Sequence, residues 1–314
     1  MELLYLLESL RVPVLNELML LITTLGEETA FLVAAMIVFW CVNKRYGYYM
    51  LSVGFLGTLT NQFLKLTFQE PRPWVIDPEF TILEQARDAA AGFSLPSGHS
   101  TSAVGTFGSI AAFTEKKWIR YACIAICILV PFSRMYIGVH TPVDVLAGAA
   151  TALVLVYALR PMCWRKLDDR KIMDLMTMML TMAFALLLFA NFYPFEIQQD
   201  QLLNLQSGSK NAYTMIGSVG GLLVVYPLEK KYVNFETKAK WWVQILKVLL
   251  GFALVLVVKE GLRVPMETLF AGHMAARAVR YFLIVIVAGL VWPMSFRWLS
   301  QSGEKNELRR NQKL

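Results

Sequence analysis

The sequence predicts an all-α protein that crosses a membrane many times. Of its 314 residues, 56% are hydrophobic and 8 are tryptophan, and the mean hydropathy of +0.49 is higher than soluble proteins show. Apolar runs of about 18 to 22 residues recur along the chain, and a helix needs roughly 20 residues to cross a hydrocarbon core of ~30 Å. The composition therefore indicates a polytopic helical membrane protein.

An N-terminal segment and about nine predicted spans account for most of the chain. Residues 1–27 mix leucine-rich patches with Glu8 and Pro13, which is typical of a helix in the membrane interface; they lack the basic start of a cleavable signal peptide. The predicted spans are 28–43, 47–68, 99–114, 119–138, 141–159, 172–193, 212–228, 242–260 and 275–299. They divide into a core over 28–160 and additional spans over 161–302, and a polar tail follows over 303–314.

Basic residues mark one side of the membrane. Lys and Arg gather in alternate connections, within 44–45, 116–120, 160–171, 230–240 and 297–313, whereas the other connections are acidic or carry few charges. Because basic loops stay in the cytoplasm, we expect a cytoplasmic C-terminus, an N-terminus outside, and the plasma membrane as the location. These loops also explain the net charge of +7, so we expect no nucleic-acid partner.

Two other features bear on packing. The four cysteines lie in or beside apolar runs without the spacing of metal ligands, so neither a disulfide framework nor a zinc site is expected. In the seventh span, Gly217, Gly220 and Gly221 predict close contact between helices.

The first polar cluster at the predicted outer face is cationic. Lys65 ends the second span, Arg72 follows between two prolines, and Arg134 ends the fourth span. A lone lysine can snorkel to the interface, but a charge costs roughly 2.5–3.5 kcal/mol near the centre of a membrane helix and so tends to mark function. Arginine forks bind phosphate oxygens bidentately and lysine adds a point charge, so the three together indicate a phosphate site.

The second cluster, Pro96-Ser97-Gly98-His99, opens a helix. The free N–H groups and the positive dipole end of a helix favour an anion, and Gly98 allows the backbone to approach an oxygen closely. Helix capping alone would explain Ser97. His99 adds a group that can give a proton to a departing oxygen.

The third cluster pairs a histidine with a carboxylate. His140 and Asp144 are spaced i, i+4, so they lie on one face of the helix that begins there. The carboxylate can accept the Nδ1–H of the imidazole and leave Nε2 as a lone-pair donor, as an oriented nucleophile requires. The alternative is a pair that only caps the helix.

These blocks resemble the signature of the type 2 phosphatidic acid phosphatase superfamily of acid-phosphatase-like enzymes. The matching blocks are Lys65-x6-Arg72-Pro73, Pro96-Ser97-Gly98-His99 and Ser133-Arg134-x5-His140-x3-Asp144. The resemblance covers roughly the core over 28–160, where it implies the catalytic region.

The resemblance implies a role for each of these residues. His140 would attack phosphorus to form a phosphohistidine, Asp144 would orient it, and His99 would protonate the leaving alcohol. The residues that would hold the phosphate oxygens are Lys65, Arg72, Ser97, Gly98 and Arg134. It further implies that no metal or other cofactor takes part.

The expected substrate is a lipid phosphate cleaved at the outer membrane face: phosphatidate, a sphingoid-base phosphate or a polyprenyl diphosphate. Leu25-Gly26-Glu27-Glu28 and Trp40-Cys41-Val42-Asn43 resemble the sphingosine-phosphate-phosphatase branch and its bacterial relatives. The nine-span layout is also similar to glucose-6-phosphatases, so a sugar phosphate is the alternative substrate. A phosphotransferase or a non-catalytic lipid transporter would use the same pocket.

Overall fold

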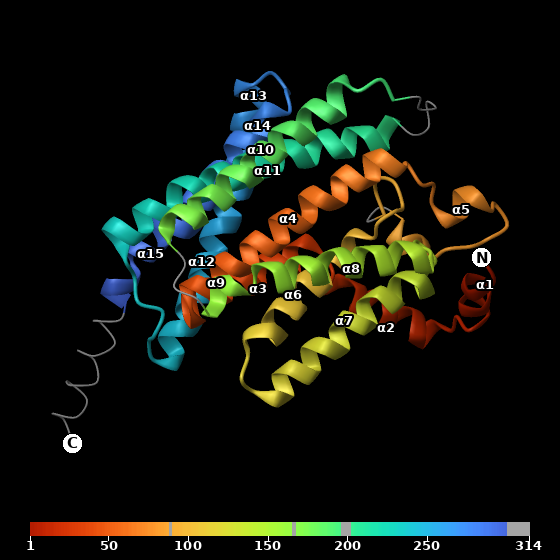
Figure 1. Cartoon of the computed structure of the whole chain (residues 1–314), viewed down its shortest axis with the longest axis horizontal. Helices are drawn as coiled ribbons and strands as arrows, with labels where there is room; N and C mark the ends of the chain where they lie inside the picture. Colours follow the sequence, from red (N-terminus) through yellow and green to blue (C-terminus); the bar gives the residue numbers. More distant parts are fainter. Residues whose placement is uncertain (88–89, 165–167, 196–201, 300–314) are drawn as a thin grey trace. The chain divides into compact units, whose positions relative to one another are not determined.

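A computed structural model describes residues 1–87, 90–164, 168–195 and 202–299 of the chain. Every regular element within these residues is helical (Figure 1), as the sequence predicts. The predicted polar tail, 303–314, lies outside the described residues. The chain folds as two compact units, which are interleaved along the sequence.

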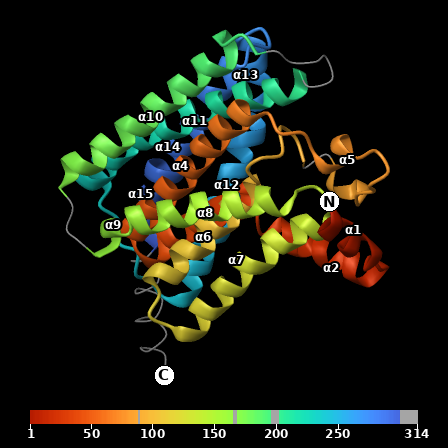
Figure 2. The same cartoon turned by 45° about the vertical axis from the view of Figure 1, so that its right-hand side comes forward.

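The first unit, referred to below as unit 1, comprises Met1–Ala35, Tyr48–Leu167 and Ala185–Asn211. The helices that contribute to it from the first 164 residues are α1 (Glu2–Ser9), α2 (Pro13–Thr24), α3 (Glu28–Ile37), α4 (Lys44–Phe68), α5 (Pro73–Ile76), the short η2 (Glu84–Ala86), α6 (Gly98–Phe113), α7 (Lys117–Ile137), α8 (Pro142–Leu159) and α9 (Pro161–Trp164). Helix α6 packs between α7 and α8, which Figure 2 shows side by side. The N-terminal segment, predicted as one interfacial helix, contains two short helices, and α2 packs against α7.

The second unit, referred to below as unit 2, comprises Met36–Gly47, Asp168–Phe184 and Ala212–Leu314. The elements that contribute to it are η1 (Val38–Val42), α10 (Asp169–Phe192), α11 (Leu202–Leu228), η4 (Glu229–Val233), α12 (Trp241–Gly261), α13 (Arg263–Leu269), α14 (Ala275–Ile286), η5 (Val287–Val291) and α15 (Trp292–Met294). Its core includes Trp40, which is 0% exposed and donates from Nε1 to the carbonyl oxygen of Ala288 at 2.9 Å. A Cβ added to Gly221 would lie 3.0 Å from the carbonyl oxygen of Phe282, so the glycines of α11 do allow close packing against α14.

The predicted count of nine crossings is not confirmed. A helix lies at each predicted position, but six helices of the described residues are long and apolar enough to cross a membrane: Lys117–Ile137, Pro142–Trp164, Asp169–Phe192, Leu202–Val233, Trp241–Leu269 and Ala275–Leu299. A seventh arises if Pro13–Thr24 and Glu28–Val42, bent by 52°, form one span. Helix α4 is not apolar enough to be counted, because it carries polar residues such as Asn61 and Lys65. Helix α6 has 16 residues, which is shorter than the roughly 20 that a span needs.

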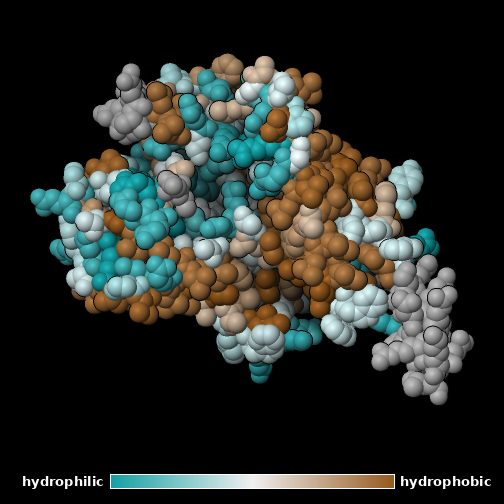
Figure 3. All heavy atoms as spheres, turned by 180° about the vertical axis from the view of Figure 1, so that it is seen from behind, coloured by the Kyte–Doolittle hydropathy of each residue, from teal (hydrophilic) through white to brown (hydrophobic). Residues whose placement is uncertain are grey.

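Several polar residues of α4 and α6, which do not pass this test, are buried inside unit 1. Asn61 is 2% exposed and Lys65 is 6% exposed. The apolar helices show the opposite pattern, because Tyr121 on α7 and Leu146 on α8 are 67% and 68% exposed. Hydrophobic residues cover wide continuous patches of the face drawn in Figure 3, as lipid contact requires. The protein is therefore a multi-pass membrane protein whose α4 and α6 are shielded by other helices.

Candidate active site

A cavity of about 340 Å³ lies within unit 1, and it collects most of the residues that the sequence singled out. Six of the eight predicted site residues line it: Lys65, Arg72, Gly98, His99, Arg134 and His140. They come from the end of α4 and the loop after it, the N-terminus of α6, the end of α7 and the α7–α8 turn. The two that do not line it are Ser97 and Asp144.

The α7–α8 turn holds His140 in place. Helix α7 ends at Gly138, whose φ of 92° is a left-handed conformation that favours glycine. Helix α8 begins with a capping box: the Thr141 side chain accepts from the Asp144 backbone N–H at 3.3 Å, and the Asp144 carboxylate accepts from the Thr141 N–H at 2.7 Å. His140, between these two helix ends, is only 2% exposed.

Asp144 caps the helix and also faces the histidine. Its Oδ2 lies 3.4 Å from Nδ1 of His140, which is long for a hydrogen bond. The two alternatives considered for this carboxylate, capping and orientation, are therefore compatible, because one buried group is placed for both.

Ser94 joins these two groups, and the sequence reasoning missed it. Its hydroxyl donates to Oδ2 of Asp144 at 2.6 Å and lies 3.4 Å from Nδ1 of His140. Ser94 is 0% exposed, and its backbone N–H donates to the carbonyl oxygen of Glu70 at 2.8 Å. The one sequence feature that could have indicated Ser94 is its position just before the Pro96-Ser97-Gly98-His99 block. No spacing rule relates Ser94 to Asp144.

Arg72 occupies the other side of the imidazole. One of its terminal nitrogens donates to Nε2 of His140 at 2.9 Å and to the carbonyl oxygen of Val139 at 2.9 Å. Its Nε donates to the carbonyl oxygen of Gly92, and its other terminal nitrogen donates to the carbonyl oxygen of Ala91, both at 3.1 Å. Because arginine can only donate, Nε2 must be the acceptor, which assigns the proton of the neutral ring to Nδ1.

The electrostatics of this turn favour the neutral imidazole. Burial, and then the positive charges of Arg72, Arg134 and Lys65, hold the pKa of His140 well below its ordinary value. Burial lowers the pKa of Arg72 to about 10, so this guanidinium is still charged at neutral pH. The geometry thus offers an uncharged lone-pair donor beside a cation.

The other cations of the cavity are held by neutral oxygens. Lys65 donates from Nζ to the carbonyl oxygen of Phe93, and Arg134 donates to the Thr23 hydroxyl at 3.0 Å. The Nε of Arg134, buried in the cavity wall, has no hydrogen-bond partner in the described part of the chain. A buried N–H without an acceptor is costly, so this wall is suited to an anion that supplies acceptor oxygens.

The α6 N-terminus presents backbone and a histidine to the cavity. Ser97 is 0% exposed, and its hydroxyl accepts from Ser100 N–H at 3.3 Å and from the Ser100 hydroxyl at 3.0 Å, so it acts as a helix cap. Gly98 and His99 line the cavity. The Nε2 of His99 has no hydrogen-bond partner among the described residues. This arrangement leaves an imidazole nitrogen available to a bound group.

Asn61 and Gly26 position this turn, and neither was a predicted site residue. Asn61 donates from Nδ2 to the carbonyl oxygen of Pro96 and to the hydroxyl of Thr101, both at 3.2 Å. A Cβ on Gly26 would lie 3.0 Å from the carbonyl oxygen of His99 and 2.7 Å from a methyl group of Val130, so a glycine allows this close approach. The sequence feature that could have indicated Asn61 is a side-chain amide in the middle of an apolar run.

The rest of the cavity wall is largely polar and partly acidic. Its residues are Glu27, Glu28, Thr58, Gln62, Ser207 and Asn211. Glu27 and Glu28 are exposed and belong to the Leu25-Gly26-Glu27-Glu28 pattern noted in the sequence. In the described residues, no group of three or more His, Cys, Asp or Glu side chains is placed to hold a metal ion.

Comparison with known proteins places two parts of the chain in one family. Residues 44–168 match the model of the PAP2 superfamily, and residues 213–304 match that of the PAP2 superfamily phosphatase, transmembrane extension. The first match contains all eight predicted site residues. No solved structure matches the chain significantly.

Three curated relatives illustrate the range of similar proteins. Undecaprenyl-diphosphatase BcrC of Bacillus subtilis is 32% identical over 36% of this chain and 55% of its own length. Phosphatidylglycerophosphatase B of the same organism is 32% identical over 48% of this chain and 76% of its own length. A probable sphingosine-1-phosphate phosphatase of Dictyostelium discoideum is 33% identical over 43% of this chain and 35% of its own length. The chain thus spans between about a third and three quarters of these relatives.

Proposed function

The chain belongs to the PAP2 superfamily, and from this membership we propose that it is a membrane-embedded phosphatase that hydrolyses lipid phosphates through a phosphohistidine. The observation that carries the proposal is the pair of imidazoles in one cation-lined cavity. His140 has a neutral Nε2 beside Arg72, and His99 has an Nε2 without a partner in the described structure. A site that only binds phosphate needs neither of these histidines.

In the first half of the proposed reaction, Nε2 of His140 attacks phosphorus while the bond from phosphorus to the lipid oxygen breaks. The Arg72 N–H that now donates to Nε2 turns to a phosphate oxygen, and Lys65 and Arg134 hold the others. The negative charge of the substrate favours a protonated His99, which gives its proton to the departing alcohol. The ring of His140 becomes positive on forming the P–N bond, and Asp144 and Ser94 stabilise its Nδ1–H.

In the second half, a water molecule attacks phosphorus and gives a proton to His99. The P–N bond breaks, so phosphate leaves and His140 returns to its neutral form. The cations and the backbone N–H groups at the α6 N-terminus stabilise the equatorial oxygens in both halves. Ser97 contributes through its backbone position in this proposal, since its hydroxyl is used by the helix cap.

We expect the substrate to be a membrane lipid rather than a soluble sugar phosphate. Support comes from the names of the relatives: an undecaprenyl-diphosphatase, a phosphatidylglycerophosphatase and a probable sphingosine-1-phosphate phosphatase. The lipids in these three names differ in their hydrophobic part. The names therefore support a class of substrate and do not identify one lipid.

The test is phosphate release by the purified protein in detergent, measured for phosphatidate, phosphatidylglycerophosphate, sphingosine phosphate, undecaprenyl diphosphate and glucose 6-phosphate. Release from at least one lipid is expected, and it should survive EDTA. Rapid quenching with ³²P-labelled lipid should give an acid-labile, base-stable label on His140. Release from glucose 6-phosphate alone, or a label on another residue, would contradict the proposal.

We further propose that the site faces the outside, because the basic connections lie at the opposite ends of the helices that carry the site residues. Sealed right-side-out vesicles with an added short-chain lipid phosphate test this placement. Release of phosphate without detergent is expected. Release that requires opening the vesicles would place the site on the cytoplasmic face.

A further inference from the structure

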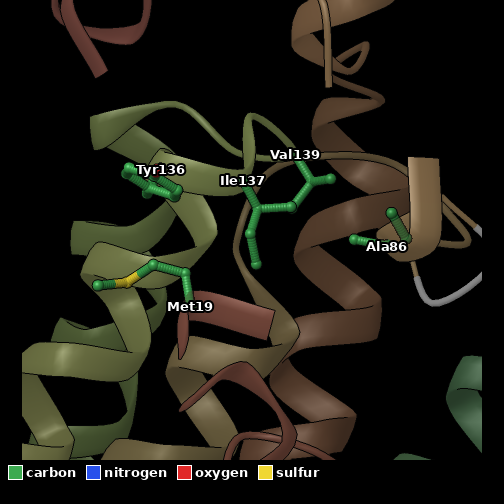
Figure 4. Close-up of a cluster of buried hydrophobic side chains, with 6 residues drawn as sticks. Met19, Ala86, Tyr136, Ile137 and Val139 are labelled. Carbon is green, nitrogen blue, oxygen red and sulfur yellow. The ribbon is translucent and has the colours of Figure 1, made fainter. Parts of the chain in front are cut away.

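The N-terminal segment, residues 1–27, lies outside the family match yet packs behind the His140 turn. Met19 of α2 shares a buried cluster with Tyr136, Ile137 and Val139, the residues that lead into His140 (Figure 4). Figure 4 shows these side chains gathered where α7 ends. The position of the turn therefore depends on packing from outside the family core.

Arg11, between α1 and α2, makes the polar part of this contact. Its Nε donates to the carbonyl oxygen of Tyr136 at 3.0 Å, and a terminal nitrogen donates to the carbonyl oxygen of Thr81 at 2.9 Å. The guanidinium carbon lies 5.5 Å from the centre of the Phe80 ring. One arginine thus connects the end of α7 with the loop before α6.

The acceptor at Tyr136 matters because the last carbonyls of a helix have no partner inside it. In α7, the carbonyl oxygens of Arg134 and Met135 accept from the turn residues Val139 and Gly138. The carbonyl oxygen of Ile137 accepts from the Leu83 N–H at 3.1 Å. Arg11 supplies the donor for the remaining one, so it completes the cap of the helix that precedes His140.

The guanidinium also packs directly on the turn. A Cβ added to Gly138 would lie 2.7 Å from a terminal nitrogen of Arg11. The Tyr136 hydroxyl reinforces the same contact by donating to Oδ1 of Asn16 at 2.9 Å. A shift of Arg11 would therefore release both the left-handed turn at Gly138 and the next two residues, Val139 and His140.

We propose that Arg11 is a positioning residue for the reaction: by capping α7 it fixes the direction of Nε2 of His140 toward phosphorus. This inference rests on the proposed function. The N-terminal segment then takes part in the chemical step through Arg11. It does not bind phosphate through this residue, because Arg11 does not line the cavity.

The experiment compares Arg11→Gln and Arg11→Lys with the wild-type protein by rapid-quench formation of the phosphohistidine and by steady-state kcat and KM. Misplacing a nucleophile by about 1 Å costs on the order of 100-fold in rate, so Arg11→Gln should slow phosphohistidine formation by roughly 10- to 100-fold. The final amplitude and KM should stay near wild type. Lysine should restore part of the rate, because it can still donate to the Tyr136 carbonyl.

The amplitude of phosphohistidine formation distinguishes a positioning role of Arg11 from a role in folding. A merely structural role predicts fewer active molecules, hence a smaller amplitude at an unchanged rate, and that result would overturn the inference. Arg87→Gln is the matched control, since Arg87 pairs on the surface with Glu84 and should leave the rate unchanged. If the wild-type protein turns over without a phosphohistidine, the mechanism fails while the Arg11 effect on kcat still tests positioning; no turnover at all would overturn both.

Discussion

The two units of the molecule differ in where their positive charges lie. In unit 1, Lys65, Arg72 and Arg134 are at most 6% exposed, and among the described residues none of them forms an ion pair with a carboxylate. In unit 2, Lys44 pairs with the buried Glu229 at 2.9 Å. The fully buried Lys247 donates to the carbonyl oxygens of Glu236 and Thr237 at 3.2 and 3.5 Å.

This difference distinguishes a site from a scaffold. A buried charge is costly unless a partner compensates it. The cations of unit 1 surround one cavity, and the Nε of Arg134 there has no acceptor among the described residues. In unit 2, Lys44 and Lys247 have acceptors within the fold, and Arg280, whose Nε has no acceptor in the described structure, lies outside that cavity. We infer that the missing negative charge in unit 1 is the substrate's phosphate.

The largest expected difference between the units is in their histidines. His140→Ala should lower kcat by on the order of 10⁴-fold or more, because the proposed nucleophile is lost. His273→Ala, in the exposed turn before α14 of unit 2, should leave phosphate release unchanged. Phosphate release by both variants, at matched amounts in the membrane, checks this. An active His140→Ala protein would refute the mechanism.

Ser94 gives the next largest effect. Ser94→Ala should lower kcat by roughly 10- to 100-fold with little change in KM, since the hydroxyl orders Asp144 and the Nδ1 side of His140 without reaching the cavity. Ser52, also 0% exposed in unit 1 but outside the cavity wall, is the control for loss of a buried serine. Equal losses in Ser94→Ala and Ser52→Ala would mean that Ser94 acts only through packing.

The pH dependence of kcat/KM tests how the cations of unit 1 affect His140. The pKa of His140 is lowered by burial and by nearby cations, so the acid limb of kcat/KM should lie below the ordinary imidazole value of about 6.5. Arg72→Gln removes a positive charge, raises that pKa and should move the limb to higher pH. A limb that stays in place, or moves to lower pH, would contradict this electrostatic assignment.

The lowered pKa of His140 also makes the stability of the protein depend on pH. Below a pH of about 6.5 the unfolded chain binds a proton at His140 that the native state resists. The native state should therefore lose stability as the pH falls from this value toward the lower native pKa. Thermal unfolding in detergent across this range, with and without His140→Ala, measures the contribution, and equal slopes for the two proteins would exclude it.

The smallest effect on activity is expected for the buried lysine of unit 2. Lys247→Met keeps the length of the side chain but removes its two hydrogen bonds, so unfolding should become easier by about 1 kcal/mol. The kcat should not change. Thermal unfolding and phosphate release measured on one preparation test both statements. A loss of turnover with an unchanged unfolding temperature would give unit 2 a part in the reaction.

The sequence alone determined the helical class, the family and the residues of its three blocks. Those conclusions follow from local patterns: hydrophobic runs, a helix start at Ser97 and the i, i+4 spacing of His140 and Asp144. Each of these patterns lies within a single continuous stretch of sequence, so it can be recognised without knowing what packs against it.

The tertiary structure decided which of these residues meet and what supports them. Ser94 reaches Asp144 across 50 residues, and Arg11 reaches the Tyr136 carbonyl across 125. Length and hydropathy identify six or seven candidate spans among the described residues, so the nine expected crossings stay unconfirmed. Helices α4 and α6, which do not pass this test, carry buried polar residues. Contacts between distant segments arise from packing and helix capping in space, and no spacing in the chain encodes them.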